Sequence, residues 1–377
     1  MVFIRSLIAV SLSVASVMAL NVTEISKCPA LKARENPAKD VTDLRIDDIS
    51  VIAGLGDSIM AGFVMNGVNH EDGTGVFNTS TVMEYRGKSY AMGGDEGAFT
   101  LANFVKNYNP DLKGSSSASR FASVCRGPLC TLPISLYYPL RDSLNAAQSG
   151  AVAMNLDYEL EYLIPRMKLE LTPESYENDW KLINLQIGSN DQCSICDPFL
   201  AEHTTPEAFG RYVEEALIRI KKEIPKVVVN LMGSFKVSGV FPLSGKNTDY
   251  CVKNGILDNE KECVCSGSSE KLEAMDRVQE GYAEKLSDIA EKYKGVPNAT
   301  FGVMYTPAPV EIETFPITAF SNVDCFHPSQ KGHGFFAKSF WNQLFTTRSE
   351  KPKLYTWETD ADIYCPTESD RLPTKNE

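Results

Sequence analysis

The sequence is poor in positive charge, and it lacks a long hydrophobic run beyond its first 20 residues. There are 37 Lys and Arg residues against 49 Asp and Glu residues, which gives a formal net charge of −12. This balance argues against nucleic-acid binding, because that function needs a basic face. Without a second long hydrophobic run, the rest of the chain has no candidate for a transmembrane helix. We therefore expect neither a nucleic-acid partner nor a membrane span.

Several common motifs are also absent or incomplete. There is no HExxH and no paired Cys/His spacing, so we expect no metal site. A dinucleotide-binding loop is excluded because its third glycine is replaced by Ile59, and a phosphate-binding loop because Val82 stands where its first glycine should be. G-x-S-x-G, the nucleophile turn of α/β-hydrolases, does not occur either. We expect no organic cofactor.

The first residues and the cysteines indicate an extracellular protein. Met1–Leu20 has one cation followed by an apolar run and small residues, which is typical of a signal peptide cleaved after Ala19. Ten cysteines in a secreted chain predict up to five disulfide bonds. Three glycosylation sequons fit the same route, and they begin at Asn21, Asn78 and Asn298. We expect secretion.

Short apolar runs alternate with segments of helical periodicity. This alternation predicts an α/β fold, namely a three-layer α/β/α sandwich with a mainly parallel central sheet. The expected strands are 49–55, 181–187, 226–232 and 300–305. The expected helices are 97–107, 155–168, 206–223, 269–292 and 330–344.

A serine follows the first predicted strand directly. Ser58 comes after a run of small and β-branched residues, so the strand should present its hydroxyl at the carboxyl end. A serine becomes a good nucleophile only when a nearby base accepts its proton. Far downstream, Asp324 and His327 supply a carboxylate and an imidazole three residues apart. The sequence therefore suggests a Ser–His–Asp arrangement.

Two further turns have suitable residues for binding an oxyanion. Gly150 ends a turn whose backbone is able to approach a ligand closely, and Asn190 follows Gly188 in a turn that offers a carboxamide donor. Parallel sheets place their sites at the carboxyl ends of strands, which is where these segments are expected. We predict that they meet there.

Together these blocks resemble the SGNH, or GDSL-type, hydrolase family, and in particular its phospholipase B branch. The branch-like segments are RGKSYAMGGD at 86–95, IGSNDQCSIC at 187–196, ECVC at 262–265 and DCFHP at 324–328. The resemblance implies a hydrolase domain over 20–345, with a cysteine-containing insertion at about 235–267 and a polar tail at 346–377.

The same resemblance implies a role for each site residue. Ser58 would be the nucleophile, His327 the base and Asp324 its partner. The backbone N–H groups of Ser58 and Gly150, with the side-chain amide of Asn190, would bind the oxyanion.

Simpler interpretations exist for most of these residues. Ser58 or Asn190 would fit as a helix cap. Of the other histidines, His333 is expected to be structural, and His70 and His203 to be solvent-exposed.

Spacing alone does not determine which cysteines are bonded to each other. A structural bond within the pair Cys193 and Cys196 is favoured over a redox role. A local bond between Cys125 and Cys130 and a bond joining the chain ends, Cys28 to Cys365, are also expected.

The resulting functional hypothesis is a secreted serine esterase that cleaves fatty-acyl esters of phospholipids or lysophospholipids, with the substrate class taken from the resemblance. Its expected partner is a lipid or other ester, encountered at a lipid–water interface, and the oligomeric state stays open. The alternatives are a carbohydrate O-acetyl esterase or general carboxylesterase of the same fold, and a non-catalytic secreted binding protein. Val237, Val240, Phe241 and Leu243 of the insertion are expected to form a rim or lid over an acyl groove.

Overall fold

The computed structural model describes residues 20–68, 81–131, 136–252, 257 and 259–377. Its centre is a four-stranded parallel sheet in the order β2-β5-β6-β7. The strands are β2 (Ile49–Gly56), β5 (Trp180–Gln186), β6 (Val227–Met232) and β7 (Phe301–Thr306). Each predicted strand is present to within a residue or two, which confirms the predicted sheet.

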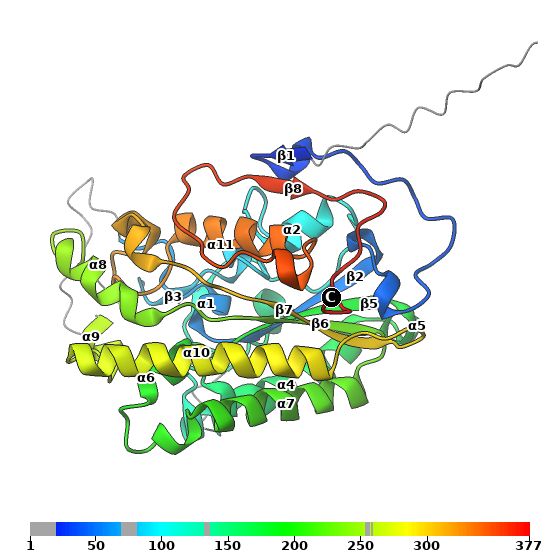
Figure 1. Ribbon diagram of the computed structural model, residues 1–377. Helices are drawn as coiled ribbons and strands as arrows, with labels where there is room; N and C mark the ends of the chain where they lie inside the picture. Colours follow the sequence, from blue (N-terminus) through cyan, green and yellow to red (C-terminus); the bar gives the residue numbers. More distant parts are fainter. Residues whose placement is uncertain (1–19, 69–80, 132–135, 253–256, 258) are drawn as a thin grey trace, which may run out of the picture.

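Helices cover both faces of this sheet (Figure 1). One face carries α4 (Leu156–Glu170), α7 (Pro206–Glu223) and α10 (Ser269–Lys292). The other carries α2 (Leu101–Lys106) and α11 (Gln330–Gln343). The three-layer α/β/α prediction is therefore confirmed.

A hydrophobic core lies on each face of the sheet, because successive side chains along a strand point to opposite faces. In β6, Val227, Val229 and Leu231 pack toward α4, α7 and α10, whereas Val228 and Met232 pack toward the opposite layer. Because both faces are buried, the strand reads as a continuous apolar run instead of a polar–apolar alternation.

Capping residues explain where most helices begin. Thr205 and Ser268 accept backbone N–H groups of α7 and α10, and both helices have the predicted bounds. The helix expected from residue 97 begins four residues later, because Thr100 is its cap and Gly97 has a left-handed φ of +74°. Among the described helices, none combines the length and apolar character that crossing a bilayer requires.

The first described strand pairs with a strand close to the C-terminus. β1 (Leu20–Val22) pairs with β8 (Ile363–Cys365), and the predicted bond between Cys28 and Cys365 is present. The tail from residue 346 packs on the domain, since Ile363 and Leu372 are buried in the core.

The remaining elements are short. Residues 83–84 (β3) and 120–121 (β4) form a small antiparallel pair. The short helices are α1 (Ser58–Ala61), α3 (Pro139–Asp142), α5 (Pro173–Asn178), α6 (Ser189–Ser194), α8 (Val240–Lys246) and α9 (Asn259–Glu262).

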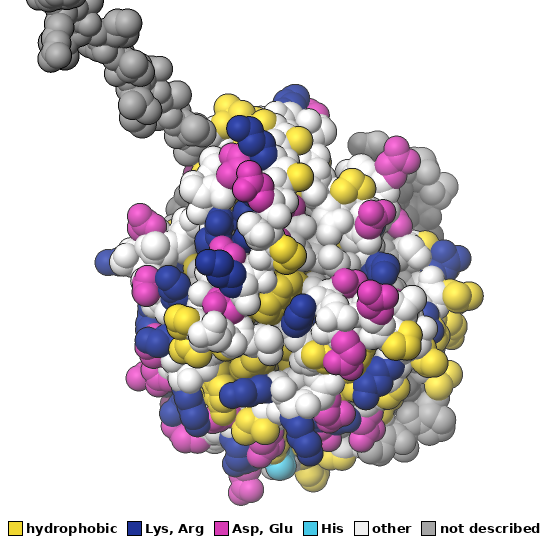
Figure 2. Space-filling view, turned by 90° about the vertical axis from the view of Figure 1, so that its right-hand side faces the viewer, with side chains coloured by type: hydrophobic (Ala, Val, Ile, Leu, Met, Phe, Trp, Pro, Cys, Tyr) yellow, Lys and Arg dark blue, Asp and Glu magenta, His cyan; other side chains and the backbone are white. Residues whose placement is uncertain are grey.

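Figure 2 shows the side of the molecule on which α5 lies, where the strands begin. On this face, cationic and anionic side chains are interspersed, and neither sign gathers into a broad patch.

Removing the bond between the chain ends should lower stability more than removing a local one. In the chain-entropy view, a disulfide stabilises by restricting the unfolded chain, and the effect grows with the length of the closed loop. Cys28 and Cys365 are 337 residues apart, whereas Cys125 and Cys130 are 5 apart. We expect the double variant Cys28→Ser/Cys365→Ser to lose roughly 2–5 kcal/mol of unfolding free energy.

The measurement is thermal and denaturant unfolding of this variant beside Cys125→Ser/Cys130→Ser as the control. Equal losses in the two variants would contradict the chain-entropy explanation for this fold.

Candidate functional site

Ser58 lies at the carboxyl end of β2, where the chain turns sharply into α1. The turn requires glycine at position 56, because a Cβ there would lie 2.2 Å from the carbonyl oxygen of Gln186 on β5. Asp57 caps α1 by accepting the N–H of Ile59 at 2.9 Å, which makes Ser58 the first helical residue. The alternative role considered for Ser58, that of a helix cap, is therefore filled by Asp57, and the Ser58 hydroxyl is left for other contacts.

The Ser58 hydroxyl contacts the predicted histidine. Its Oγ lies 2.7 Å from Nε2 of His327, although the two residues are 269 positions apart. On the other side of the ring, Nδ1 lies 2.7 Å from Oδ2 of Asp324. Ser58, His327 and Asp324 are all almost fully buried. The structure thus brings together the three residues that the sequence predicted to meet.

A tight loop before α11 holds the imidazole in place. Oδ1 of Asp324 accepts the backbone N–H groups of Phe326 at 2.9 Å and His327 at 3.1 Å. Cys325, which directly follows Asp324, has a left-handed φ of +50° and is bonded to Cys251 of the insertion, a pairing that the sequence did not predict. The carboxylate therefore fixes both its own loop and the ring.

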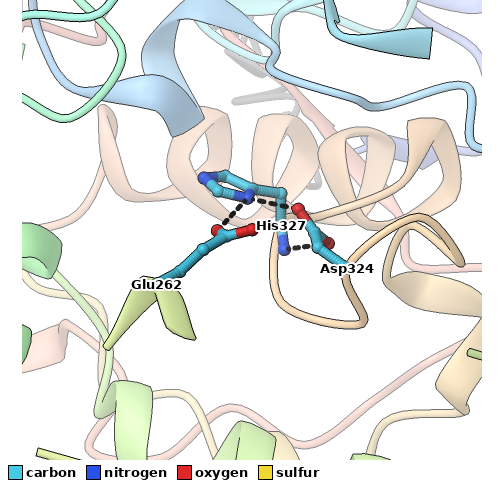
Figure 3. Close-up of side chains that lie close together, drawn as sticks. All are labelled: Glu262, Asp324 and His327. Atoms are coloured by element: carbon cyan, nitrogen blue, oxygen red, sulfur yellow. Dashed lines mark hydrogen bonds and ion pairs between the residues drawn. The ribbon is translucent and has the colours of Figure 1, made fainter. Parts of the chain in front are cut away.

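A second carboxylate approaches the same ring nitrogen. Oε2 of Glu262, from α9, lies 3.4 Å from Nδ1 of His327, and Figure 3 shows it on the ring side that Asp324 also contacts. In the sequence, Glu262 begins the ECVC segment, and nothing in its spacing indicates a contact with His327.

These three side chains also form a group that is able to surround a cation. One ligand atom each from Glu262, Asp324 and His327 lie within 4.8 Å of one another. However, Nδ1 of His327 already has its hydrogen-bond partner at 2.7 Å in Asp324. We therefore interpret the group as a hydrogen-bonded and ionic cluster around the imidazole.

The electrostatics of the cluster favour the protonated imidazole. Burial opposes the charge on His327, but the charge and hydrogen bond of Asp324 and the charges of Glu262 and Asp57 outweigh it, so the pKa of His327 is raised above 6.5. Burial also raises the pKa of Asp57 to about 6, and that of Asp191 to about 7. Asp324, Glu262 and Asp57 are thus the carboxyl groups that favour a positive charge on His327.

The two predicted oxyanion segments lie next to each other. Asn190 is in α6, directly after β5, and its amide nitrogen donates to the carbonyl of Ala151 at 3.0 Å. Gly150 has a φ of +86°, which favours glycine. The same turn is tied to the end of β2, because the N–H of Gln148 donates to the carbonyl of Gly56 at 3.0 Å. Both segments therefore gather at the end of β2 that carries Ser58.

A buried ionic cluster supports this turn from behind. Arg86 contacts Glu84 at 2.8 Å and donates to the carbonyls of Asn145 and Ala147 at 2.9 and 2.6 Å. Glu84 in turn accepts the hydroxyl of Ser149 at 2.7 Å. In the sequence, Arg86 begins the segment RGKSYAMGGD, which gives no sign of a contact with the turn before Gly150. Only the structure shows that Arg86 supports this turn.

The predicted bond within Cys193 and Cys196 is wrong. Cys193 is bonded to Cys263 and Cys196 to Cys265, so that α6 and the insertion are joined twice. The close spacing of Cys193 and Cys196 suggested a local bond, but each of them is bonded to a cysteine of the insertion instead. The bond between Cys125 and Cys130 is confirmed.

The predicted apolar lid is also mostly wrong. Val237, Val240 and Leu243 are buried in the core and are not available to cover a groove. Phe241 is only partly buried and packs against Phe326, with ring centroids 6.4 Å apart. The insertion therefore supports the loop that carries His327.

The other histidines do not join the site. His333 is buried, accepts the N–H of Tyr90 at 3.2 Å and has a pKa lowered by burial to about 3, which confirms a structural role. His203, which was expected to be solvent-exposed, is half-buried and contacts the hydroxyl of Tyr212 at 2.8 Å. His70 and the sequon at Asn78 lie outside the described residues.

Comparisons with known proteins identify a matching family and related sequences. A family model described as "GDSL-like Lipase/Acylhydrolase" matches residues 52–340. The chain is 30% identical over 353 residues to "Phospholipase B1, membrane-associated" of Homo sapiens, which covers 91% of this chain and 22% of the relative. The protein of the same name from Mus musculus is 29% identical over 360 residues, with 90% and 22% covered. The chain thus spans about a fifth of the length of the curated relatives it matches.

The solved structures that match the chain include an esterase and a lipase. An acetyl-xylooligosaccharide esterase of Geobacillus is 17% identical with a TM-score of 0.34, covering 78% of this chain and 93% of that one. An extracellular lipase from Streptomyces rimosus is 13% identical with a TM-score of 0.32, covering 75% and 94%.

Proposed function

Because this chain belongs to the GDSL-like lipase/acylhydrolase family and is a carboxylic ester hydrolase, we propose that it cleaves fatty-acyl esters of phospholipids or lysophospholipids, with Ser58 as nucleophile. The observation that carries the mechanism is the pair of 2.7 Å contacts that join Ser58, His327 and Asp324. The lipid substrate is supported by the name of the relatives, phospholipase B1.

The first half of the proposed reaction forms an acyl-enzyme. His327 accepts the Ser58 proton at Nε2 while the serine oxygen attacks the ester carbonyl carbon. Asp324 holds the Nδ1 proton and stabilises the imidazolium. The carbonyl oxygen becomes an oxyanion, which accepts hydrogen bonds from the backbone N–H groups of Ser58 and Gly150 and from the Asn190 amide. His327 then gives its proton to the leaving alcohol.

The second half repeats this sequence with water. His327 takes a proton from a water molecule, which attacks the acyl carbon, and the serine oxygen leaves with that proton. The products are a free fatty acid and the regenerated enzyme. Every proton transfer in this scheme uses the one imidazole nitrogen that faces Ser58.

We also propose that the protein is secreted and that its substrate is met at a lipid–water interface. Five disulfide bonds, with no free cysteine, are compatible with folding in an oxidising compartment. The net charge of −12 does not favour adhesion to anionic membranes, so a zwitterionic lipid surface is the better candidate.

An acyl-chain series tests the substrate class. We expect purified protein to release fatty acid from phosphatidylcholine or its lyso form, and to hydrolyse soluble esters with longer acyl chains faster than acetate esters. Fatty-acid release and initial rates across the acetyl-to-palmitoyl series are the measurements. A clear preference for acetyl esters, acetylated sugars included, would instead favour the O-acetyl esterase.

A further inference from the structure

The catalytic imidazole has more carboxylate around it than a Ser–His–Asp arrangement requires. Asp324 alone accepts the Nδ1 proton at 2.7 Å and also anchors the backbone of the loop. Glu262 comes from a separate element, α9, yet its Oε2 lies 3.4 Å from the same nitrogen (Figure 3). The His327 loop has its own anchors in Asp324, so Glu262 is not required to shape it.

We propose that Glu262 is a second carboxylate of the His327 base, a positioning residue that stabilises the imidazolium from the side opposite the substrate. This inference rests on the proposed function, since it gives Glu262 a part in the same proton transfers. Asp324 directs the ring through a short hydrogen bond, while Glu262 acts mainly through its charge at a slightly longer distance.

The local environment makes that charge effective. The Glu262 side chain is 16% exposed and that of His327 is 6% exposed, so little solvent screens the interaction. Two carboxylates held close together repel each other unless a positive charge lies between them. The imidazolium that forms during each proton transfer supplies this charge, so Glu262 stabilises the charged state more than the neutral one.

Three disulfide bonds hold Glu262 in this position. The residue directly after it, Cys263, is bonded to Cys193, and Cys265 is bonded to Cys196. The insertion is also bonded to the histidine loop through Cys251 and Cys325. A carboxylate on an unrestrained surface loop would lose its contact by motion, whereas here the insertion is fixed to both α6 and the loop.

The sign of the pH effect follows from the groups that face His327. These are Asp324 on its own loop, Asp57 before α1, Glu262 on α9, and His333 on α11, whose low pKa leaves it neutral. The base must be neutral to act, so activity falls as the pH drops through the pKa of His327, which lies above 6.5. Removing one negative charge lowers that pKa and moves the acid limb to lower pH.

The test is the pH dependence of kcat/KM for Glu262→Gln on a soluble short-chain ester. We expect the acid limb to move down by about one pH unit, and the rate at the alkaline plateau to fall about three- to tenfold. Glu260→Gln is the matched control, because it removes an exposed charge from the same helix and should leave the profile unchanged. A loss of packing alone would lower the rate without moving the limb.

Two further variants make the result decisive. Glu262→Asp keeps the charge but draws it back by one methylene, so it should move the limb in the same direction by a smaller amount. Glu262→Asp also tests the inference if Glu262→Gln does not fold. A folded variant at position 262 whose acid limb coincides with that of the wild type would overturn the inference. If Ser58→Ala kept activity, the proposed function would fail first, so the two failures are distinguishable.

Discussion

Replacing Ser58 with alanine should abolish ester hydrolysis, with a loss in kcat on the order of 10⁵ to 10⁶. Without the hydroxyl, no acyl-enzyme forms, and His327 has no proton to accept at the position where its Nε2 now meets Ser58 at 2.7 Å. The remaining rate would come from oxyanion binding and substrate positioning alone.

The same variant should fold normally. The Ser58 side chain packs little volume, and Asp57, not Ser58, caps α1. One lost hydrogen bond changes the unfolding free energy by only about 1 kcal/mol. Initial rates and thermal melting, measured together, separate loss of chemistry from loss of structure.

A covalent probe gives an independent measurement. A fluorophosphonate should attach to the wild-type protein on the peptide that contains Ser58, and it should not attach to Ser58→Ala. Ser117→Ala, which removes an exposed hydroxyl elsewhere, should keep both labelling and activity. Retained activity in Ser58→Ala, or labelling on another peptide, would move the nucleophile to a different residue.

Much of the fold was predictable because local signals agreed with the tertiary structure. The β6 run is apolar throughout, as a strand buried on both faces must be. Residues 206–223 have a capping Thr205, a proline at the first helical position and an amphipathic pattern, and the observed helix has the same bounds. The start of α2 was predicted at Gly97, but the helix begins after Thr100, because the Thr100 side chain caps it.

The candidate nucleophile and base were predictable for a different reason. Ser58 directly follows the strand β2, and Asp324 and His327 come after the strand β7 in the chain. Because parallel sheets place their sites at the carboxyl ends of strands, the two segments were expected at the same edge of the sheet. The sequence did not reveal the contact of Glu262 with His327, because it depends on the path of an insertion. Disulfide bonds set that path, and spacing in the sequence does not show which cysteines are bonded to each other.

Replacing Asn190 with alanine should lower kcat by about 10² to 10³, with KM changed much less. A carboxamide nitrogen has two donor hydrogens, and one of them goes to the carbonyl of Ala151 at 3.0 Å. We expect the other to donate to the oxyanion, which exists only along the reaction path. A donor used only there contributes to kcat and little to substrate binding.

The contact with Ala151 also gives Asn190 a structural part, and two variants separate the two roles. Asn190→Asp keeps the size of the side chain but replaces the donor with a negative charge, so its loss should exceed that of Asn190→Ala. Ser194→Ala is the control for disturbance of α6, because the Ser194 hydroxyl donates to the carbonyl of Asn190 at 2.6 Å without being placed among the oxyanion donors. If Asn190→Ala melts earlier but turns over at the wild-type rate, Asn190 only joins two turns, and the oxyanion must be held by backbone N–H groups alone.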